Sequence, residues 1–487
     1  MKKLLQNPML VLMAVIVLTS VLIPTGVKSQ NISTKANSYV LIAWNDLGMH
    51  CANKYFNNFC VLPPYNNQHA QLVLVGDVSN SPQVLTTGYH TTYEIPGNTY
   101  SVGKTDFWTY VNSLFGASLA NNVGLTGVGL TGNFLKTSNY FHVEGIPVTP
   151  YTDADLVNEH PYQLAFIKAY DTSNNLLTTT QSVIPVSNEL SCISSGCHTS
   201  EAQILSLHPT VSGFNPANTP IMCANCHKDN ALGMAGVAGI PAFSQAMHQF
   251  HGDETNDCYK CHPGPNTQCF RDIMHTGGMT CQDCHGSVTN VGNTIENGRE
   301  AWLQEPDCGA TACHGSTYAS ETGKLFRNSQ GHGGMFCSAC HGSPHAILPT
   351  VQANDNIQNI ALQGYAGTLN KCSVCHGVAP TGAGPHGLYA SEMEYDAALH
   401  NETLLRDISP NPVSETATIG FMLDKNAKVT LQVYNQMGQR VRLLMDKHLN
   451  QGSYNVSLNT SNLPAGTYFY TMMVDGRSYS KKMLVVR

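Results

Sequence analysis

The chain has 487 residues and a formal net charge of −7, and charged residues make up only 12% of it. This length predicts two to four domains, and the lack of a basic cluster argues against nucleic acid as a partner. All but two of the 17 cysteines lie between Cys192 and Cys375, so the middle of the chain is expected to have a chemistry of its own.

The first residues indicate export. Lys2 and Lys3 precede an almost wholly apolar stretch at residues 9–23, and a small residue, Ser29, follows. This order is typical of a secretory signal peptide, and it predicts residues 1–29 as the signal peptide. A membrane anchor is the alternative, but the apolar stretch falls short of the roughly 20 residues that cross a bilayer. We therefore expect no membrane span after cleavage.

Residues 38–186 carry the pattern of β-strands. Short β-branched and aromatic runs bounded by turn residues recur, among them "SYVLIAW", "AQLVLVG", "QLAFIKAY" and "TTTQSVIPV". Such spacing predicts a β-rich, sandwich-like N-terminal domain, with a barrel as the alternative. One helix is expected near "DFWTYVNSLFG".

Residues 187–403 lack this pattern. Their apolar runs are short, and Gly, Pro, Asn and His interrupt them. A stretch of this length with so little periodicity is not expected to fold around a core of its own side chains. Something other than side chains must therefore fill its interior.

Strand patterns return in residues 407–487. "KVTLQVYN" alternates cleanly, and "GQRVRLL", "GSYNVSL", "GTYFYTMMVDG" and "KKMLVV" follow at short intervals. They predict a compact Ig-like β-sandwich of roughly 80 residues. The preceding stretch "SEMEYDAALHNETLLRD" is typical of a linker helix.

Seven units in the middle region consist of two cysteines followed directly by histidine. Five have the spacing Cys-x-x-Cys-His, and two, "CISSGCH" and "CGATACH", have four residues between the cysteines. Cysteines one helical turn apart can form both thioether bonds to the vinyl groups of a c-type haem, and the histidine then lies under the iron. A gap of four residues can loop out and still reach both vinyl groups. We therefore predict seven covalently attached haems c. The attachment cysteines are Cys192, Cys197, Cys223, Cys226, Cys258, Cys261, Cys281, Cys284, Cys308, Cys313, Cys337, Cys340, Cys372 and Cys375. The proximal iron ligands are His198, His227, His262, His285, His314, His341 and His376.

Two other interpretations of these cysteines explain less. Zinc sites pair two Cys-x-x-Cys units and do not need histidine after every second cysteine. Disulfides are expected in an exported protein but leave the histidines unexplained. Haem also explains the folding, because seven large apolar rings provide the missing core. The middle region is thus predicted to be an irregular, haem-cored domain with short helices, disordered without haem.

Eight further histidines in this region are candidates for the second axial position. His275 and His332 hold the same place in two similar stretches, "HTGGMTCQDCHGS" and "HGGMFCSACHGS", just before the first cysteine. An open position can bind and reduce a substrate, whereas a second histidine closes it and leaves an electron carrier. We predict both as distal ligands, with a neighbouring haem as a possible target. The candidate distal ligands are His208, His248, His251, His275, His332, His345 and His386, with His400 as the spare and Met274, Met279 and Met335 as alternatives.

The remaining histidines and cysteines are expected to be structural or to lie on the surface. The histidines in this group are His50, His69, His90, His142, His160 and His448. Cys51 and Cys60 are a candidate disulfide in an oxidising compartment. Cys269 is left over, either buried and inert or paired between chains.

Two regions resemble known families. On its seven motifs, the middle region resembles the multihaem c-type cytochromes of respiratory and extracellular electron transfer. The stretches "WNDLGMHC" and "VLPPYNNQHAQLV" resemble a β-rich domain found ahead of haem clusters in such proteins. Residues 407–487, with "SPNP", "VTLQVYNQMGQRV", "LPAGTYFY" and the end "SYSKKMLVVR", are similar to the type IX secretion sorting domain. That resemblance implies recognition by type IX secretion machinery, passage across both membranes and a cell-surface or extracellular location, usually with removal of the domain. An ordinary accessory sandwich is the alternative.

Two functions follow from these patterns. The first is electron transfer along closely spaced bis-His haems to extracellular acceptors or partner cytochromes, with self-assembly into a filament left open. Successive proximal histidines are only 23 to 35 residues apart, so the haems must crowd together. The second is a reductase of a small nitrogen or sulfur oxyanion with one open haem. Some such reductases use a Cys-x-x-Cys-Lys site, which this sequence lacks. We therefore expect an electron-transfer protein rather than an enzyme.

Overall fold

The computed structural model describes residues 39–486 except 189–190, 265–266, 319, 378, 388–403, 406–407, 409, 424, 436–438, 451 and 475–476. The predicted signal peptide, most of the predicted linker helix and His400 lie outside the described residues. Among the residues that are described, no helix is both long and apolar enough to cross a bilayer.

The N-terminal region contains two five-stranded sheets, as the strand patterns predict. The first sheet consists of β1 (Tyr39–Trp44), β4 (Asn66–Leu74), β9 (Phe141–Ile146), β8 (Leu135–Lys136) and β5 (Gln83–Leu85), which pairs with β4. The second sheet, in order, consists of β2 (His50–Cys51), β11 (Leu176–Ser187), β10 (Tyr162–Asp171), β6 (Tyr89–Glu94) and β7 (Thr131–Asn133). Strand pairs are antiparallel except β2 with β11.

The two sheets share one side-chain core. In β10, alternate residues point inward, and Ala165, Ile167 and Ala169 have no exposed surface, as expected from the two-residue period of a strand. They join Leu41 and Leu72 from the first sheet in a single buried cluster. The predicted helix is also present as α1 (Phe107–Phe115), which ends at a left-handed Gly116.

The middle region consists of short elements joined by irregular loops. Its helices are α2 (Glu201–Leu207), η1 (Cys223–Asn225), α3 (Phe243–His251), η2 (Cys258–Lys260), α4 (Ile273–Thr276), α5 (Cys281–His285), α6 (Val288–Glu296), η3 (Ser316–Tyr318), η4 (Phe326–Asn328), η5 (His332–Gly334), α7 (Cys337–His341), α8 (Ala353–Gln363), α9 (Ser373–His376) and η6 (Pro385–Gly387). In the described part of this region, the buried apolar side chains are Leu205, Met222, Ala224, Phe270, Ile295, Phe336, Ala339, Ala346 and Leu348. For some 200 residues this is a sparse core.

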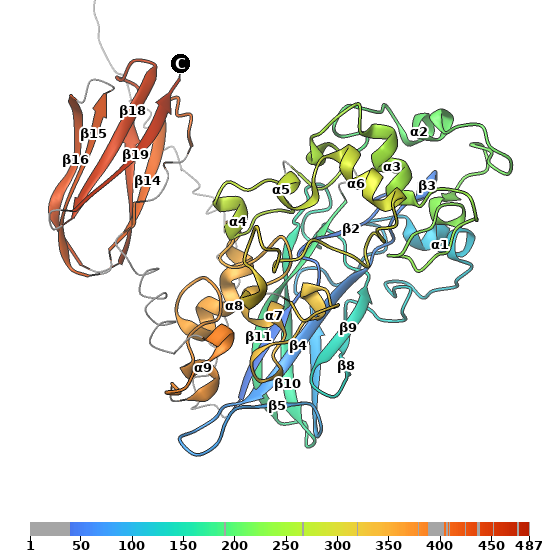
Figure 1. The fold of residues 1–487 in the computed structure, drawn as a ribbon, viewed down its shortest axis with the longest axis horizontal. Coiled ribbons are helices and arrows are strands. Elements are labelled where there is room, and N and C mark those ends of the chain that lie inside the picture. The colour runs from blue at the N-terminus through green and yellow to red at the C-terminus, as the bar shows by residue number, and fades with distance from the viewer. Residues whose placement is uncertain are drawn as a thin grey trace, which may run out of the picture. The chain divides into compact units, whose positions relative to one another are not determined.

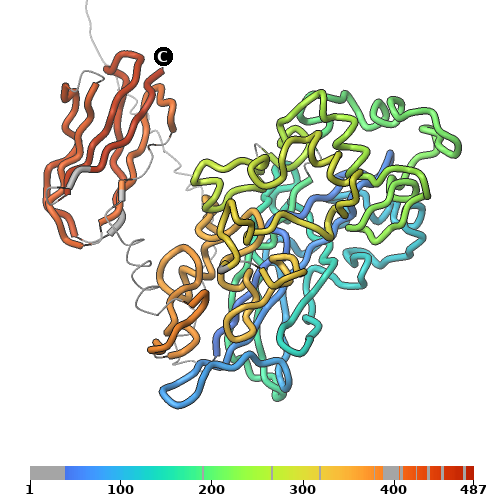
Figure 2. Tube along the Cα trace, in the orientation of Figure 1, coloured from blue at the N-terminus to red at the C-terminus, as the bar shows by residue number. Residues whose placement is uncertain are grey.

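The middle region packs directly against the N-terminal sandwich. At one end of the contact, β12 (Ile221–Met222) pairs with β3 (Phe59–Cys60) in parallel. At the other, the Gly76 amide donates to the carbonyl of Cys375 at 2.8 Å. Figures 1 and 2 show the green to orange chain of residues 200–376 beside the blue and teal strands.

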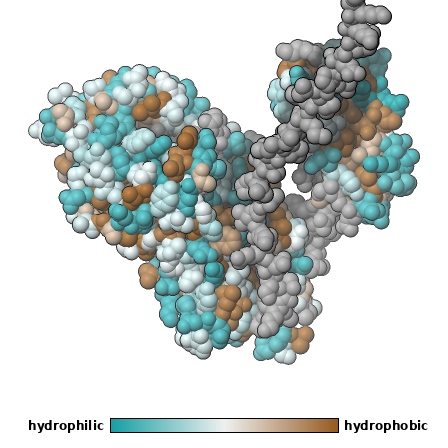
Figure 3. All heavy atoms as spheres, turned by 180° about the vertical axis from the view of Figure 1, so that it is seen from behind, coloured by the Kyte–Doolittle hydropathy of each residue, from teal (hydrophilic) through white to brown (hydrophobic). Residues whose placement is uncertain are grey.

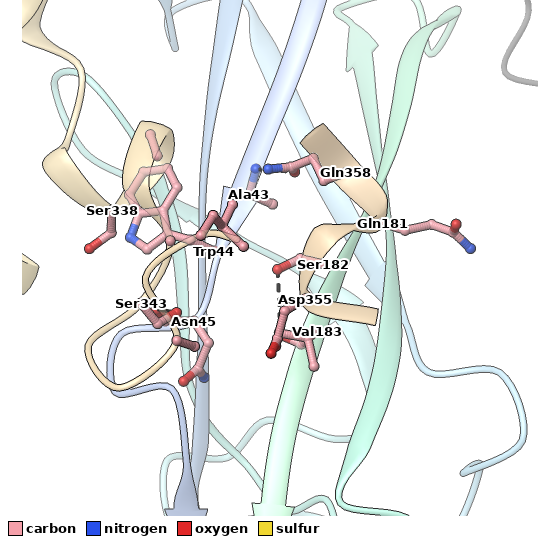
Figure 4. A pocket seen from close by; sticks show the side chains of 14 residues that line it. Ala43, Trp44, Asn45, Gln181, Ser182, Val183, Ser338, Ser343, Asp355 and Gln358 are labelled. Atoms are coloured by element: carbon pink, nitrogen blue, oxygen red, sulfur yellow. Dashed lines mark hydrogen bonds between the residues drawn. The ribbon is translucent and has the colours of Figure 1, made fainter. Parts of the chain in front are cut away.

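A buried ion pair lies in this contact. Arg271, with no exposed surface, donates to both carboxylate oxygens of Asp355 in α8, at 2.7 and 2.9 Å. The same guanidinium donates to the carbonyl of Gly48 at 2.7 Å. Nearby, the Ala43 amide donates to the side chain of Gln358 at 2.8 Å (Figure 4). The cavity at this seam measures about 30 Å³, which is room for water but not for a cofactor.

The C-terminal region, taken by itself, is a two-sheet structure. One sheet is β13 (Leu404–Leu405), β14 (Thr416–Leu423) and β17 (Gly452–Asn459). The other is β16 (Arg440–Leu449), β15 (Ala427–Asn435), β18 (Gly466–Val474) and β19 (Arg477–Val485). Alternate residues of β15, namely Val429, Leu431 and Val433, are fully buried in the shared core. Every predicted strand is therefore present.

Small mixed groups of hydrophilic and hydrophobic residues cover the face seen in Figure 3. Large exposed apolar side chains of the described residues, such as Val78, Phe250 and Leu303, come from separate elements. Singly exposed apolar residues are normal for a protein surface.

Candidate haem-binding centres

One backbone hydrogen bond closes the regular cysteine motifs. The amide of the histidine donates to the carbonyl of the first cysteine, at 3.0 Å for His227, 2.9 Å for His262 and 2.9 Å for His376. In the other two regular motifs, the same residues form the one-turn helices α5 and α7. The two cysteines and the histidine therefore occupy a single helical turn, as thioether attachment and axial ligation of one haem require.

The two long-gap motifs close with the same hydrogen bond. The amide of His198 donates to the carbonyl of Cys192 at 3.0 Å, and that of His314 to the carbonyl of Cys308 at 3.2 Å. The two additional residues loop out between the cysteines, and the histidine returns to the first cysteine. This geometry supports equal treatment of the seven motifs, as the sequence predicts.

Glycine follows the histidine in four motifs and ends the turn. Gly286, Gly315, Gly342 and Gly377 all have φ between +67° and +87°, a conformation that favours glycine. At Gly377 a Cβ atom would also lie 2.6 Å from the carbonyl oxygen of Gly76. The motif thus needs glycine there both for its backbone conformation and for its contact with the sandwich.

Six motif histidines each face one of the predicted distal histidines. The ring centres are 5.9 to 6.3 Å apart. The pairs, motif histidine first, are His198 with His251, His227 with His208, His262 with His248, His285 with His345, His341 with His386, and His376 with His332. Sequence distance does not determine these pairs, because His285 and His345 are far apart in the chain.

The spacing fits two axial ligands of one metal. An ion between two opposed imidazoles keeps the ring centres about 6.2 Å apart, since each metal–nitrogen bond is about 2.0 Å and the ring centre lies roughly 1.1 Å behind the nitrogen. The tetrahedral angle of zinc would bring the centres to about 5 Å with the same bonds. Ordinary aromatic contacts also span these distances, so the pairing itself, one motif histidine with one distal candidate, is the more specific feature. One other pair, His69 with His142, lies on the sandwich at 6.4 Å.

Backbone carbonyls set the tautomer of four of these histidines. The Nδ1 atom lies 2.9 Å from the carbonyl oxygen of Pro209 in His208, and 2.8 Å from that of Pro241 in His227. In α3, His248 and His251 make the same contact to carbonyls one turn earlier, at 2.7 and 2.8 Å. A carbonyl only accepts, so Nδ1 carries the proton and the lone pair is on Nε2. This is the arrangement of a metal-ligating histidine.

Burial keeps several of these rings neutral. Burial is the main cause, neighbouring histidines contribute as well, and together they lower the pKa of His262, His341 and His345 to about 4.

The backbone is unusual at two distal candidates. His345 has φ of +60° and His386 of +56°, values that few residues other than glycine adopt. Strain of this kind is concentrated at functional sites. By contrast, His275 is held by a regular cap, since the Asp272 side chain accepts from the His275 amide at 3.0 Å.

The other histidines described next contact neighbouring side chains or are exposed. His50 contacts Asp46 at 2.8 Å, and His160 contacts Asp155 at 3.0 Å. His69 stacks on Trp44 and Tyr140, His90 stacks on Tyr170, and His448 is exposed on β16. Cys60 is buried, and the charge of Cys223 contributes to the burial-driven rise of its pKa. Pairing of Cys51 with Cys60 stays a prediction, as does the role of Cys269.

Across the described residues, no three or more His, Cys, Asp or Glu side chains converge on a point where they could hold a metal. Each histidine pair therefore offers two ligands, one from each ring. Sequence reasoning found every histidine in these pairs but not their partners. It also missed the carbonyl contacts and the Arg271–Asp355 pair, for which the sequence offers no local signal.

Comparison with known proteins identifies the C-terminal region. Residues 407–486 match the family described as the secretion system C-terminal sorting domain. No curated protein matches the chain. The crystal structure of the Ig1 domain of mouse SynCAM 2 is 17% identical, with a TM-score of 0.13, over 18% of this chain and 93% of that chain. The structure of dimeric latent PorU from Porphyromonas gingivalis is 11% identical, with a TM-score of 0.17, over 92% of this chain and 34% of that chain.

The sorting domain covers the last sixth of the chain. It indicates export to the cell surface or the extracellular space, and it implies contact with the type IX secretion machinery. The chain is therefore an exported, multidomain and mostly β-rich protein whose C-terminal region is a secretion sorting domain.

Proposed function

We propose that this protein is a multihaem c-type cytochrome that carries electrons at the cell surface, to extracellular acceptors or partner cytochromes. The observation that carries the proposal is the set of six histidine pairs, each with one histidine from a cysteine motif and one from outside it. Haem c would supply one-electron iron chemistry at each pair. The cysteines of each motif would hold the ring covalently.

The seventh pair is assigned by two arguments. Of the seven motif histidines and the seven main distal candidates, the six pairs leave His275 and His314. In addition, His332 lies just before the sixth motif but faces His376 of the seventh. His275 holds the same place before the fourth motif, so the repeat assigns it to His314 of the fifth. The similarity of the two stretches thus reflects one role, in which each histidine serves the next haem along the chain.

Full axial ligation favours electron transfer over catalysis. With seven motif histidines and seven partners, no iron position is left for a substrate. The chain's own residues would then act by closing both faces of each haem and by holding neutral imidazoles in place through burial and carbonyl contacts. A reductase would need one open position, and the pairs give no reason to propose one.

Haem content tests the proposal most simply. Mass spectrometry of the mature protein should show seven covalent haems, which add about 4 kDa to the polypeptide through paired thioethers. A Cys223→Ala/Cys226→Ala variant should lose one haem, and a Cys308→Ala/Cys313→Ala variant should lose one as well. Five haems in the parent, with no loss from the second variant, would mean that the long-gap motifs do not bind haem. A chain without covalent haem would overturn the proposal.

A further inference from the structure

We infer that the seven haem motifs form one unbranched row in the spatial order second, first, third, fourth, fifth, sixth, seventh, with the second and seventh at opposite ends of the N-terminal sandwich. The inference rests on the proposed function, because it takes each motif as a haem position. It adds the order in which electrons would pass along the haems, with the first motif of the chain inside the row and not at one of its ends.

Helix α3 joins the first and third motifs. His248 and His251 lie one turn apart on α3, and they face His262 of the third motif and His198 of the first. Residues three apart are neighbours on one helix face, with Cβ atoms about 5–6 Å apart. The Ser191 amide, next to the first motif, also donates to the carbonyl of Cys261 at 3.3 Å. The haems at the first and third motifs would therefore be adjacent.

The second motif also adjoins the first. Helix α2 begins just after His198 and ends just before His208, which faces His227 of the second motif. Seven helical residues span about 10 Å, so the first motif and the second axial pair must be close. The first motif therefore lies next to both the second and the third.

The row continues through the third, fourth and fifth motifs. The loop before Cys258 is tied to the fourth motif, since the Gln282 side chain donates to the carbonyl of Asn256 at 2.6 Å. The proposed pairing of His275, just before the fourth motif, with His314 places the fifth motif next to the fourth.

The last three motifs follow chain order. The ring centre of Tyr318, shortly after the fifth motif, lies 5.0 Å from that of His386, which faces His341 of the sixth motif. The fifth motif therefore lies beside the sixth. The Leu369 amide, shortly before the seventh motif, donates to the carbonyl of Cys340 at 2.8 Å. The distal ligand of the seventh motif, His332, lies just before the sixth.

Strand β4 sets the distance between the two ends. The Ile221 amide, next to the second motif, donates to the carbonyl of Asn58 at 2.9 Å, ahead of the start of β4. The carbonyl of Cys375 in the seventh motif accepts from Gly76, just beyond the end of β4. Nine strand residues span about 30 Å. The sandwich therefore acts as a rigid support along which the row extends, and each end presents a terminal haem to a partner.

Iron positions in the holoprotein test this order directly. An anomalous difference map at the iron edge should show seven peaks in one row, with the iron at His198 between those at His227 and His262. The irons at His227 and His376 should be the most distant pair, at about 30 Å or more. A row that ends at His198, a branched arrangement or neighbouring second and seventh irons would overturn the inference. Fewer than seven peaks would count against the seven-haem function, while the order of the remaining irons would still confirm or contradict the row.

Discussion

The N-terminal sandwich and the middle region lie side by side but are built differently. The sandwich buries alternate side chains of two sheets in one apolar cluster. The middle region buries few apolar side chains, and its most regular internal feature is a set of histidine pairs. Side chains stabilise the first region. In the second, we propose, covalently bound haems do so.

The comparison teaches how a weakly patterned sequence can still have a defined fold. In a loop-rich segment, the conformational entropy lost on folding normally outweighs the free energy gained from its few contacts. Attachment of a large apolar group at regular intervals supplies buried surface that the sequence pattern cannot show. In such a sequence, the cysteines and histidines show where the apolar group would attach.

The largest expected effect is that of haem removal. When the full chain is made in a host that cannot attach haem, residues 192–376 should lose protection in amide hydrogen exchange, because their core is missing. The two sandwiches should keep theirs, since their cores are made of side chains. Equal protection of the middle region with and without haem would show that it folds on its own and would break the comparison.

Arg271 forms a buried ion pair with Asp355 inside the middle region and contacts the sandwich through the carbonyl of Gly48. Breaking a fully buried ion pair on one side typically costs about 3–5 kcal/mol, so Arg271→Met should lower the unfolding free energy of the holoprotein by about that amount. Lys324→Met, at the exposed pair with Glu321, is the matched control and should cost at most about 1 kcal/mol. The double variant Arg271→Met/Asp355→Leu should recover much of the loss. If Arg271→Met costs no more than the control, the buried pair stabilises the protein no more than an exposed pair does.

A cavity in the core of the sandwich should not change haem binding. Phe141 is fully buried in the sandwich core, and Phe141→Ala should cost about 3–5 kcal/mol of stability. Haem content and the visible spectrum should be those of the parent at temperatures where the protein stays folded. Loss of haem from this variant would mean that the two cores are not independent.

Removal of a distal ligand should change one haem and little else. In His332→Ala, one of seven haems should become high-spin and bind carbon monoxide, and its potential should rise because an electron-donating imidazole is lost. His275→Ala should do the same at the haem of His314. His90→Ala, on the sandwich, is the control and should leave every haem low-spin. Fully low-spin spectra for both His275→Ala and His332→Ala would show that these residues are not ligands.

The smallest expected effect on the haems is that of deleting residues 407–487. This region matches a sorting domain and has a core of its own. The truncated protein should keep the parent spectrum but stay in the periplasm, as fractionation followed by haem staining would show. Normal surface delivery of the truncated protein would contradict the role of the sorting domain.

Much of the fold can be predicted from the sequence because strands have a simple period. The alternation in β10 and β15 and the helix at α1 follow from local patterns, and the structure has all three. The haem motifs are equally local, since a cysteine pair and its histidine occupy one turn. The looped closure at Cys192 and Cys308 was expected from the same reasoning.

The histidine partners could not be predicted, because they depend on tertiary structure. His208 and His227 are near in sequence, whereas His285 and His345 are joined only by the packing of distant loops. Two signals did exist. The spacing of His248 and His251 places both on one helix face, and the repeat around His275 and His332 pointed to a shared role. Arg271 and Asp355 gave no such signal, because a buried ion pair between distant segments has no local pattern.

The central claim is that every haem has two histidine ligands, and the spin state of the unmodified protein tests it most directly. Visible and EPR spectra of the pure, oxidised holoprotein should show only low-spin ferric haem, with little binding of carbon monoxide after reduction. A substantial high-spin ferric signal, together with fast reduction of nitrite or hydroxylamine, would contradict the account and would favour a reductase with an open haem.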